Sequence, residues 1–104
     1  MKIGNKDIGL KYQPFIIAEM SGNHNQSLER ALEIVGEAAK TGAHALKLQT
    51  YTAGTMTLNV KVGEFFIDDK DSLWKGKSLY ELYEEAHTPW EWHKPIMKRA
   101  NELG

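Results

Sequence analysis

Apolar residues gather in two short runs, with a helical pattern between them. Residues 15–20 read Phe-Ile-Ile-Ala-Glu-Met, a near-continuous apolar run typical of a buried parallel strand. Residues 28–42 place apolar side chains three and four positions apart, which predicts an amphipathic helix with Ser27 as its N-cap and Gly42 as its end. Residues 43–50 form a second strand-like run. Strand, helix and strand in this order predict a βαβ unit with parallel pairing.

Weaker patterns flank this unit. Two apolar pairs within residues 1–12, separated by Gly4-Asn5-Lys6-Asp7, predict a small hairpin. Residues 51–77 are polar and aromatic without a regular period, and they predict a long loop. Loops of this length are uncommon unless they are functional or disordered.

Two Ser/Thr-x-x-Glu patterns mark helix starts after the loop. Ser78 with Glu81, and Thr88 with Glu91, each predict a capping box, in which side chains satisfy the free backbone N–H groups of the first turn. Pro95 lies inside the second helix and lacks an N–H, so we expect a kink or a distorted first turn there.

Composition and charge exclude several classes of protein. The chain is 41% hydrophobic and 26% charged, which is normal for a globular domain. Thirteen basic and fourteen acidic residues give a net charge of −1, which argues against nucleic acid or an anionic membrane as the main partner. The absence of cysteine excludes a disulfide scaffold and a thiolate zinc site. No segment has the pattern of a signal or a membrane span, so we expect a soluble, cytoplasmic protein.

The order of elements predicts a fragment of a larger fold. A helix within a βαβα series normally leads into another strand, and here the sequence stops at Gly104. Two parallel strands with three helices cannot cover both faces of a sheet or close a barrel. We therefore expect residues 1–104 to be one part of a domain whose partner strands come from elsewhere.

Polar side chains interrupt both strands near their carboxyl ends. Side chains alternate across a strand, so Glu19 in the first strand and Lys47 and Gln49 in the second are expected to point to one side. Open α/β sheets and α/β barrels place their active sites at this end of the strands. One interpretation is a structural Glu–Lys ion pair, since buried charges must be paired. The other, which we favour, is a site for an anionic substrate.

The turn between the first strand and the helix is a second candidate for a binding site. Residues 21–26 supply amides such as that of Asn23, the imidazole of His24 and backbone donors at a helix N-terminus, which attracts phosphate or carboxylate. The same residue types are common in ordinary turns. The residues alone leave three roles open for His24, namely metal ligand, general acid and polar turn residue.

The long loop and the remaining histidines carry weaker signals. Trp74-Lys75-Gly76-Lys77 either packs the loop down or forms a lid that grips a sugar. His44, His87 and His93 have no ligand spacing and are interpreted as structural. No complete metal site is evident in the sequence.

In their order and spacing, short strings of the chain resemble the sialic acid synthase family. They are Ile-Ala-Glu-Met at 17–20, Gly-Asn-His-Asn at 22–25 and Ala-Leu-Lys-Leu-Gln-Thr at 45–50. Residues 72–80 and 88–93 resemble the pseudaminic acid branch of that family in particular. The resemblance extends over nearly the whole chain.

The resemblance implies the N-terminal βαβα part of a TIM (β/α)8 barrel, an α/β fold preceded here by a short hairpin. The implied reaction joins phosphoenolpyruvate to an N-acetylated amino sugar aldehyde, the 6-deoxy diacetamido altrose, and gives pseudaminic acid and phosphate. A divalent metal (Mn²⁺ or Mg²⁺) with ligands outside this chain, a C-terminal antifreeze-like domain and a homodimer at full length are also implied. The alternatives are N-acetylneuraminate synthesis from N-acetylmannosamine, and an inactive, self-associating barrel fragment.

The resemblance also implies roles for single residues. Glu19 is the expected catalytic residue, near the reacting carbons, where it positions or activates water. Lys47 is expected to bind phosphoenolpyruvate, since a fixed ammonium suits a carboxylate or phosphate. The 104-residue chain by itself is expected to be inactive. Further residues expected to bind substrate are Gln49, Asn23, His24, Trp74 and Lys77.

Overall fold

The computed structural model describes all 104 residues, and a pair of parallel strands lies at its centre. β3 (Ile17–Glu19) pairs with β4 (Ala45–Lys47) in a register that places Glu19 opposite Lys47. α1 (Leu28–Lys40) connects the two strands. The predicted βαβ unit and its parallel pairing are confirmed, although each regular strand is shorter than the apolar run that contains it.

α1 begins and ends where local sequence signals predict. The Ser27 hydroxyl accepts a hydrogen bond from the Arg30 N–H at 3.2 Å, which is the expected N-cap. The helix ends at Lys40, and Gly42 follows with a left-handed φ of 79°, which a glycine adopts without steric cost.

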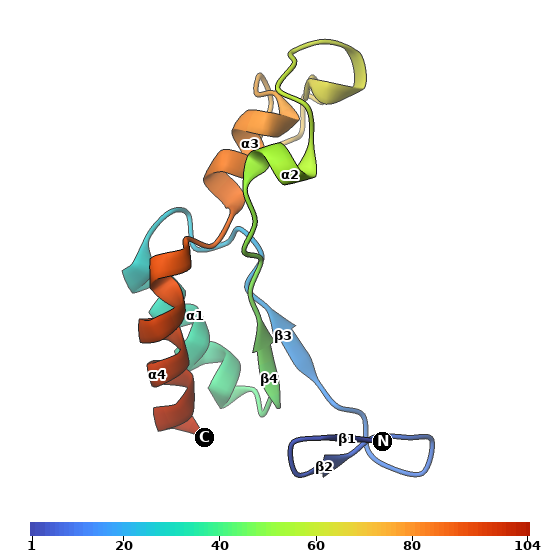
Figure 1. Ribbon diagram of the computed structural model, residues 1–104, viewed down its shortest axis with the longest axis vertical. Coiled ribbons are helices and arrows are strands. Elements are labelled where there is room, and N and C mark those ends of the chain that lie inside the picture. The colour runs from blue at the N-terminus through green and yellow to red at the C-terminus, as the bar shows by residue number, and fades with distance from the viewer.

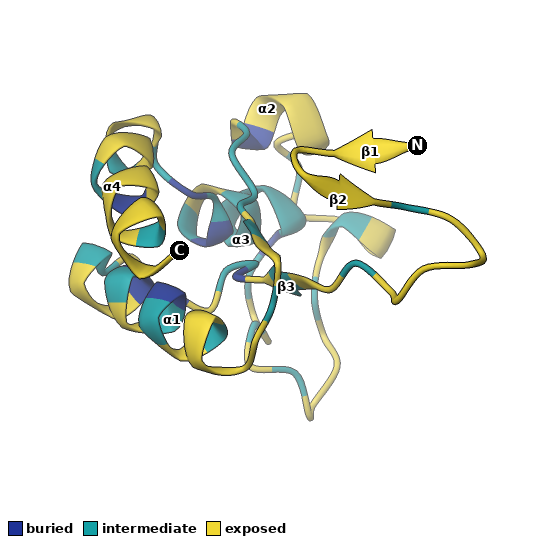
Figure 2. Cartoon of the chain, turned by 90° about the horizontal axis from the view of Figure 1, so that it is seen from below, coloured by how far each residue is buried: buried dark blue, intermediate teal, exposed yellow.

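The hydrophobic core is small and lies on one face of the strand pair. α4 (His93–Leu103) runs beside α1 on that face (Figure 1). Four buried residues form the core cluster, and Figure 2 places buried positions on both helices. The buried cluster is Met20, Ala31, Val35 and Ile96.

The opposite face of the strand pair is open, which corrects the expectation of a fully buried strand. Ile17, which shares this face with Glu19, is 50% exposed. Leu46, on the covered face, packs against the core cluster. The apolar run is therefore half-covered, because within these residues helices pack against only one side of the two strands.

The N-terminal hairpin is confirmed, but its turn is shorter than expected, because Lys6 and Asp7 belong to the second strand. β1 (Lys2–Ile3) and β2 (Lys6–Asp7) pair antiparallel, and Gly4 in the turn has a φ of 55°. Figure 1 shows this hairpin at the end of the molecule opposite α2 and α3. It therefore lies away from the carboxyl ends of β3 and β4.

The segment expected as a long loop contains regular elements. α2 (Ala53–Met56) and the 3-10 helix η1 (Gly63–Phe65) interrupt it. Ile67 donates an N–H to the Lys77 carbonyl at 3.0 Å and accepts one from Gly76 at 2.8 Å. These backbone hydrogen bonds and short helices form without a repeating pattern of apolar residues. The spacing of apolar residues in the sequence therefore did not reveal them.

One of the two predicted capping boxes forms. At the start of α3 (Leu79–Ala86), Ser78 and Glu81 satisfy each other's backbone N–H groups. The box predicted at Thr88 is wrong, because the next helical turn, η2 (Trp90–Trp92), takes Pro89 as its N-cap. Thr88 lies one position too early to cap it, and its hydroxyl makes no hydrogen bond.

The second helix starts with the distortion expected from proline. α4 is preceded directly by the 3-10 turn η2, and Pro95 is its third residue. At that position the missing N–H would have bonded back to Glu91, in the 3-10 turn. The regular α-helix therefore begins after a tighter turn.

The chain has an open shape. Its radius of gyration is 16.7 Å, whereas a compact domain of this size has about 13 Å. Two small layers, α1/α4 and α2/α3, are joined near the carboxyl ends of the strands (Figure 1). The fold class is therefore mixed α/β, as predicted, and no closed barrel forms within these residues. None of the helices has the length and apolar character needed to cross a bilayer.

Candidate active site

An ion pair joins the two central strands at their carboxyl ends. The Lys47 Nζ lies 2.5 Å from the Glu19 Oε1. Both side chains are 51% exposed and lie on the strand face opposite the core. A half-exposed ion pair adds little to stability, because water screens it. The pair is thus poorly suited to a purely structural role and is accessible to an anion.

Backbone hydrogen bonds continue the strand pair just beyond these charges. The Met20 N–H donates to the Lys47 carbonyl at 3.1 Å. The Gln49 carbonyl accepts the Thr88 N–H at 2.8 Å. These bonds tie the end of β4 both to the other strand and to the segment between α3 and α4. The Gln49 side chain is half-buried, and the contact that places the residue is made by its backbone.

Asn23 closes the turn after β3. Its side-chain Nδ2 donates to the Met20 carbonyl at 2.9 Å, and its own carbonyl accepts from the Arg30 Nε at 2.7 Å. Both contacts stay within the turn and the first helical turn of α1. In this chain Asn23 is exposed and shapes the loop directly beyond Glu19.

His24 is fully buried. Its Nδ1 accepts a hydrogen bond from the Gln26 N–H at 3.0 Å, and its ring meets Trp92 edge-on with 5.0 Å between centroids. Burial lowers the pKa of His24 below its ordinary 6.5, an effect that the backbone of Ala86 partly offsets. The ring has no exposed surface in this structure with which to contact a substrate.

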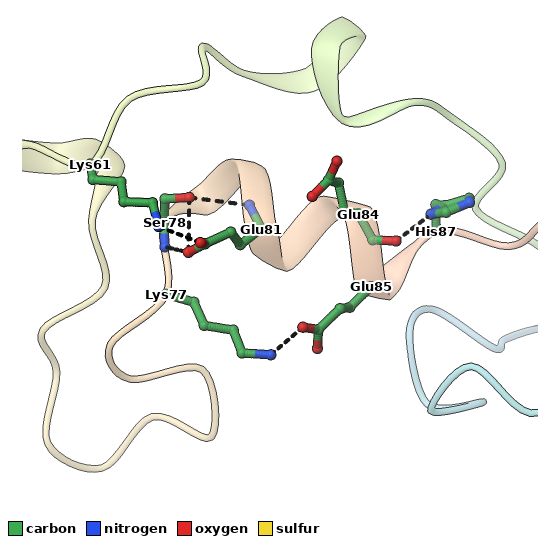
Figure 3. A network of polar contacts seen from close by, with 7 residues as sticks. All are labelled: Lys61, Lys77, Ser78, Glu81, Glu84, Glu85 and His87. Atoms are coloured by element: carbon green, nitrogen blue, oxygen red, sulfur yellow. Dashed lines mark hydrogen bonds and ion pairs between the residues drawn. The ribbon is translucent and has the colours of Figure 1, made fainter.

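Trp74 and Lys77 lie apart from the Glu19–Lys47 pair. Lys77 forms an ion pair with Glu85 of α3 (Figure 3), and its Nζ lies 5.5 Å from the centroid of the Trp74 ring. The segment between α2 and α3 occupies the end of the molecule remote from α1 and α4 (Figure 1). The structure therefore brings Glu19 and Lys47 together and places Trp74 and Lys77 elsewhere.

The other three histidines each make a hydrogen-bonding contact within the chain, consistent with a structural interpretation. The His44 Nδ1 accepts the Ile16 N–H at 2.9 Å. His87 bonds a carbonyl of α3 at 2.8 Å, and the His93 Nε2 lies 2.5 Å from the Thr50 hydroxyl. No three side chains of histidine, aspartate or glutamate gather to hold a metal ion.

Comparison with known proteins decides the family. A family model described as the NeuB family matches residues 34–104. The chain belongs to the NeuB family. The resemblance predicted from the short strings is thereby confirmed, and the matched range includes Lys47 and Gln49.

Relatives of this NeuB chain include synthases of pseudaminic acid and of N,N'-diacetyllegionaminic acid. Pseudaminic acid synthase of Campylobacter jejuni is 49% identical over 104 residues, which are 100% of this chain and 29% of that protein. Pseudaminic acid synthase of Helicobacter pylori is 47% identical over 90 residues, 86% of this chain and 26% of that protein. N,N'-diacetyllegionaminic acid synthase of Legionella pneumophila is 34% identical over 102 residues, 97% of this chain and 28% of that protein. The chain spans less than a third of the length of these curated relatives.

Sequence reasoning missed a pocket beside the NeuB strand pair. It has a volume of about 380 Å³ and lies between the segment that follows β4, α3 and Trp90. Tyr51 forms one wall, and burial together with neighbouring Tyr83 raises its pKa above the ordinary 10.0. The aromatic residues were visible in the sequence, but only the fold shows that α3 returns to meet them. Its lining residues are Tyr51, Thr52, Ala53, Gly54, Tyr80, Glu84, His87 and Trp90.

Proposed function

We propose that this chain is part of a pseudaminic acid synthase. The reaction joins phosphoenolpyruvate to the 6-deoxy diacetamido altrose and releases pseudaminic acid and phosphate. Pseudaminic acid synthases match the chain at 49% and 47% identity, against 34% for the legionaminic acid synthase, so N-acetylneuraminate synthesis is not favoured. The observation that carries the proposal is the accessible Glu19–Lys47 pair at the carboxyl ends of parallel strands.

Lys47 is the proposed anchor for phosphoenolpyruvate. Its ammonium is paired with one carboxylate at 2.5 Å and is half exposed. The carboxylate and phosphate of phosphoenolpyruvate would compete for the same ammonium through charge-assisted hydrogen bonds. Substrate binding at Lys47 would thus free the Glu19 carboxylate beside it.

Glu19 is the proposed base for the water that enters the reaction. The C3 carbon of phosphoenolpyruvate uses the electron pair of the C2–C3 double bond to form a bond to the aldehyde carbon of the sugar, which leaves C2 electron-poor. The aldehyde oxygen becomes a hydroxyl by taking up a proton from water. Water then adds to C2 as its proton passes to the freed Glu19 carboxylate. In the tetrahedral intermediate the bond between C2 and the phosphate oxygen breaks, the C2 hydroxyl becomes a carbonyl as its proton passes to the departing phosphate, and phosphate leaves. Lys47 offsets the negative charge that gathers at this point.

The residues of this chain do not fit a metal centre. Glu19, the carboxylate between the strand ends, already has an ammonium 2.5 Å away, and that positive charge opposes a second cation. No other group of ligands gathers around it. An Mn²⁺ or Mg²⁺ ion with ligands outside these residues stays a prediction.

The proposal extends to the whole protein. The strand pair with one open face suits the start of a (β/α)8 barrel, in which further strands would extend the sheet and close it. The chain spans 29% of the length of the Campylobacter jejuni relative, which fits a segment holding only the first strands and helices of a (β/α)8 barrel. A cytoplasmic homodimer with a C-terminal antifreeze-like domain belongs to the same proposal.

Phosphate release from phosphoenolpyruvate tests this function. The longest form that the gene encodes would be assayed with Mn²⁺ and either the altrose or N-acetylmannosamine, and we expect release with the altrose. Release with mannosamine alone would assign the sialic acid reaction. No release with either sugar from a folded protein would overturn the proposal. The 104-residue chain assayed beside it is expected to release none.

Variants of two ion-paired lysines locate the site. Lys47→Met is expected to lower kcat/KM for phosphoenolpyruvate by about 100-fold, since it removes the anchoring charge. Lys40→Met is the matched control, because Lys40 also forms an exposed ion pair, with Glu37 at 2.7 Å on α1. Equal activity of the two variants would remove Lys47 from the site.

Trp74 provides a test of sugar recognition. In this structure Lys77 is held by Glu85, so a sugar contact by the 74–77 segment requires that ion pair to open. If Trp74 grips the less polar 6-deoxy sugar, Trp74→Ala is expected to raise KM for the sugar by about 10-fold and to leave KM for phosphoenolpyruvate unchanged. An unchanged sugar KM would remove Trp74 and its lid from the proposal.

A further inference from the structure

The turn that follows Glu19 is conformationally strained. Three of its residues that are not glycine have left-handed φ angles: Ser21 (51°), Asn25 (47°) and Gln26 (57°). Residues with a Cβ avoid this region, so surrounding contacts must hold them there. Strain of this kind gathers at functional sites, and here it begins two residues after Glu19.

His24 is the buried contact at the centre of this turn. Its Nδ1 accepts the Gln26 N–H at 3.0 Å, and Gln26 is one of the left-handed residues. A nitrogen that accepts an N–H carries no proton of its own. Because burial keeps the ring neutral, the single ring proton must lie on Nε2. The hydrogen-bond pattern thus selects one tautomer of His24.

The Nε2–H group of His24 has a buried position and no hydrogen-bond partner within bonding distance. The nearby backbones of Ala86 and His87 raise the pKa of this ring and partly offset its burial, but neither accepts a hydrogen bond from Nε2. Gly22, in the same turn, lies so close to Ala86 that an added Cβ would come within 3.0 Å of the Ala86 Cβ. The turn is therefore seated directly against the end of α3.

The same region holds the end of β4. Thr88 is fully buried, and its N–H bonds the Gln49 carbonyl at 2.8 Å, two residues beyond Lys47. Trp92 meets the His24 ring edge-on with 5.0 Å between centroids. The segment from Ala86 to Trp92 therefore contacts the chain just after Glu19 and just after Lys47.

We propose that His24 is a positioning residue for the Glu19–Lys47 pair. Its Nδ1 holds the strained turn from inside through the Gln26 N–H, and its buried ring packs that turn against Trp92. A ring with no exposed surface touches no substrate, so its effect reaches the reaction through Glu19. This inference rests on the proposed synthase function and adds a role for a buried side chain.

Three variants of the longest encoded form separate positioning from general stability. His24→Asn keeps an acceptor for the Gln26 N–H but lacks the outer half of the ring, which is buried beside Trp92, whereas His24→Gln reaches the Nε2 position and fills part of that space. The matched control is His44→Asn, because His44 also accepts one backbone N–H through Nδ1, from Ile16 at the other end of β3.

The readout is the split between kcat and KM in phosphate release. His24→Asn is expected to lower kcat by about 100-fold, the loss that a misplacement of about 1 Å produces, with KM for phosphoenolpyruvate changed by less than about 2-fold. His24→Gln is expected to recover kcat to within about 10-fold of wild type, and His44→Asn to leave kcat unchanged. A folded His24→Asn with wild-type kcat, or an equal loss in His44→Asn, would overturn the proposal.

Two further measurements keep the proposal testable if activity is lost for another reason. Nitrogen chemical shifts of wild-type His24 are expected to report a proton on Nε2, and a proton on Nδ1 would overturn the proposal without any variant. If the wild-type protein releases no phosphate, the synthase function fails, and hydrogen exchange decides His24 separately. The Met20 N–H, which bonds the Lys47 carbonyl, should then exchange faster in His24→Asn than in His44→Asn. Equal rates would exclude positioning.

Discussion

At the scale of single residues, strand alternation and register decide which charges meet. Glu19 and Lys47 occupy equivalent positions of two parallel strands, so their side chains leave the same face and meet at 2.5 Å. A slip of one residue would turn either side chain to the helix-covered face. Asn23 and His24, a few residues further on, shape and bury the turn that follows Glu19.

The buried His24 predicts an acid-sensitive fold. Burial lowers its pKa in the folded chain below 6.5, so the unfolded chain binds a proton at higher pH than the folded chain does. This contribution is complete above about pH 6.5 and is lost as pH falls from there towards the folded-state pKa. Urea unfolding at about pH 7.5 and about pH 5.5 should show a lower free energy of unfolding at the acid value. His24→Gln should reduce that difference, and a difference that His24→Gln leaves intact would contradict the assignment.

At the scale of elements, capping shows how one sequence motif has two outcomes. In the box at α3, Glu81 bonds Lys61 and the Ser78 N–H (Figure 3), which lowers the pKa of Glu81 to about 2. Its carboxylate therefore stays ionised throughout the neutral and mildly acidic range. At Thr88 the helix starts one residue later, and the hydroxyl is buried without a partner.

The two capping positions predict opposite stability changes. Ser78→Ala removes a formed cap and is expected to lower the free energy of unfolding by about 1 kcal/mol. Thr88→Val removes an unpaired buried hydroxyl at nearly constant volume and is expected to be neutral or stabilising. Chemical denaturation of both variants measures the difference. A larger loss for Thr88→Val than for Ser78→Ala would show that the Thr88 hydroxyl has a partner.

At the scale of the whole molecule, the open strand face and the open shape of the chain leave a large accessible surface. The accessible surface is 7738 Å², whereas a compact chain of this mass exposes roughly 5,900 Å². Half-exposed Ile17 lies on this face, and the outer edges of both strands are unpaired. The 104 residues therefore leave apolar surface and backbone groups that further protein would cover.

We expect the isolated 104-residue chain to self-associate at micromolar concentration, because strand edges and apolar side chains are exposed together. Sedimentation velocity measures the distribution of species. Ile17→Lys, on the open face, should raise the monomer fraction. Leu10→Lys is the control, since Leu10 is fully exposed and lies outside both strand pairs. A monomeric wild-type chain would contradict the expectation.

The sequence by itself determined the features that depend on neighbours within a few residues. Apolar periodicity located α1 and the two central strands, and Ser27 and Ser78 marked helix starts, because an N-cap bonds groups only two or three positions away. Side chains alternate between the two faces of a strand, and this alternation was sufficient to predict that Glu19 and Lys47 share one face of the strand pair.

Only the tertiary structure decided features that join distant segments. His24 is buried because Trp92 and the end of α3 cover it, and no local pattern shows that they do. Thr88 loses its capping role because its backbone is tied to Gln49, far earlier in the chain, and the helix begins at the next turn. Trp74 lies apart from Glu19 because the 57–77 segment folds onto α3. Packing between remote elements sets these outcomes, and the free energy of such contacts depends on the whole fold rather than on adjacent residues.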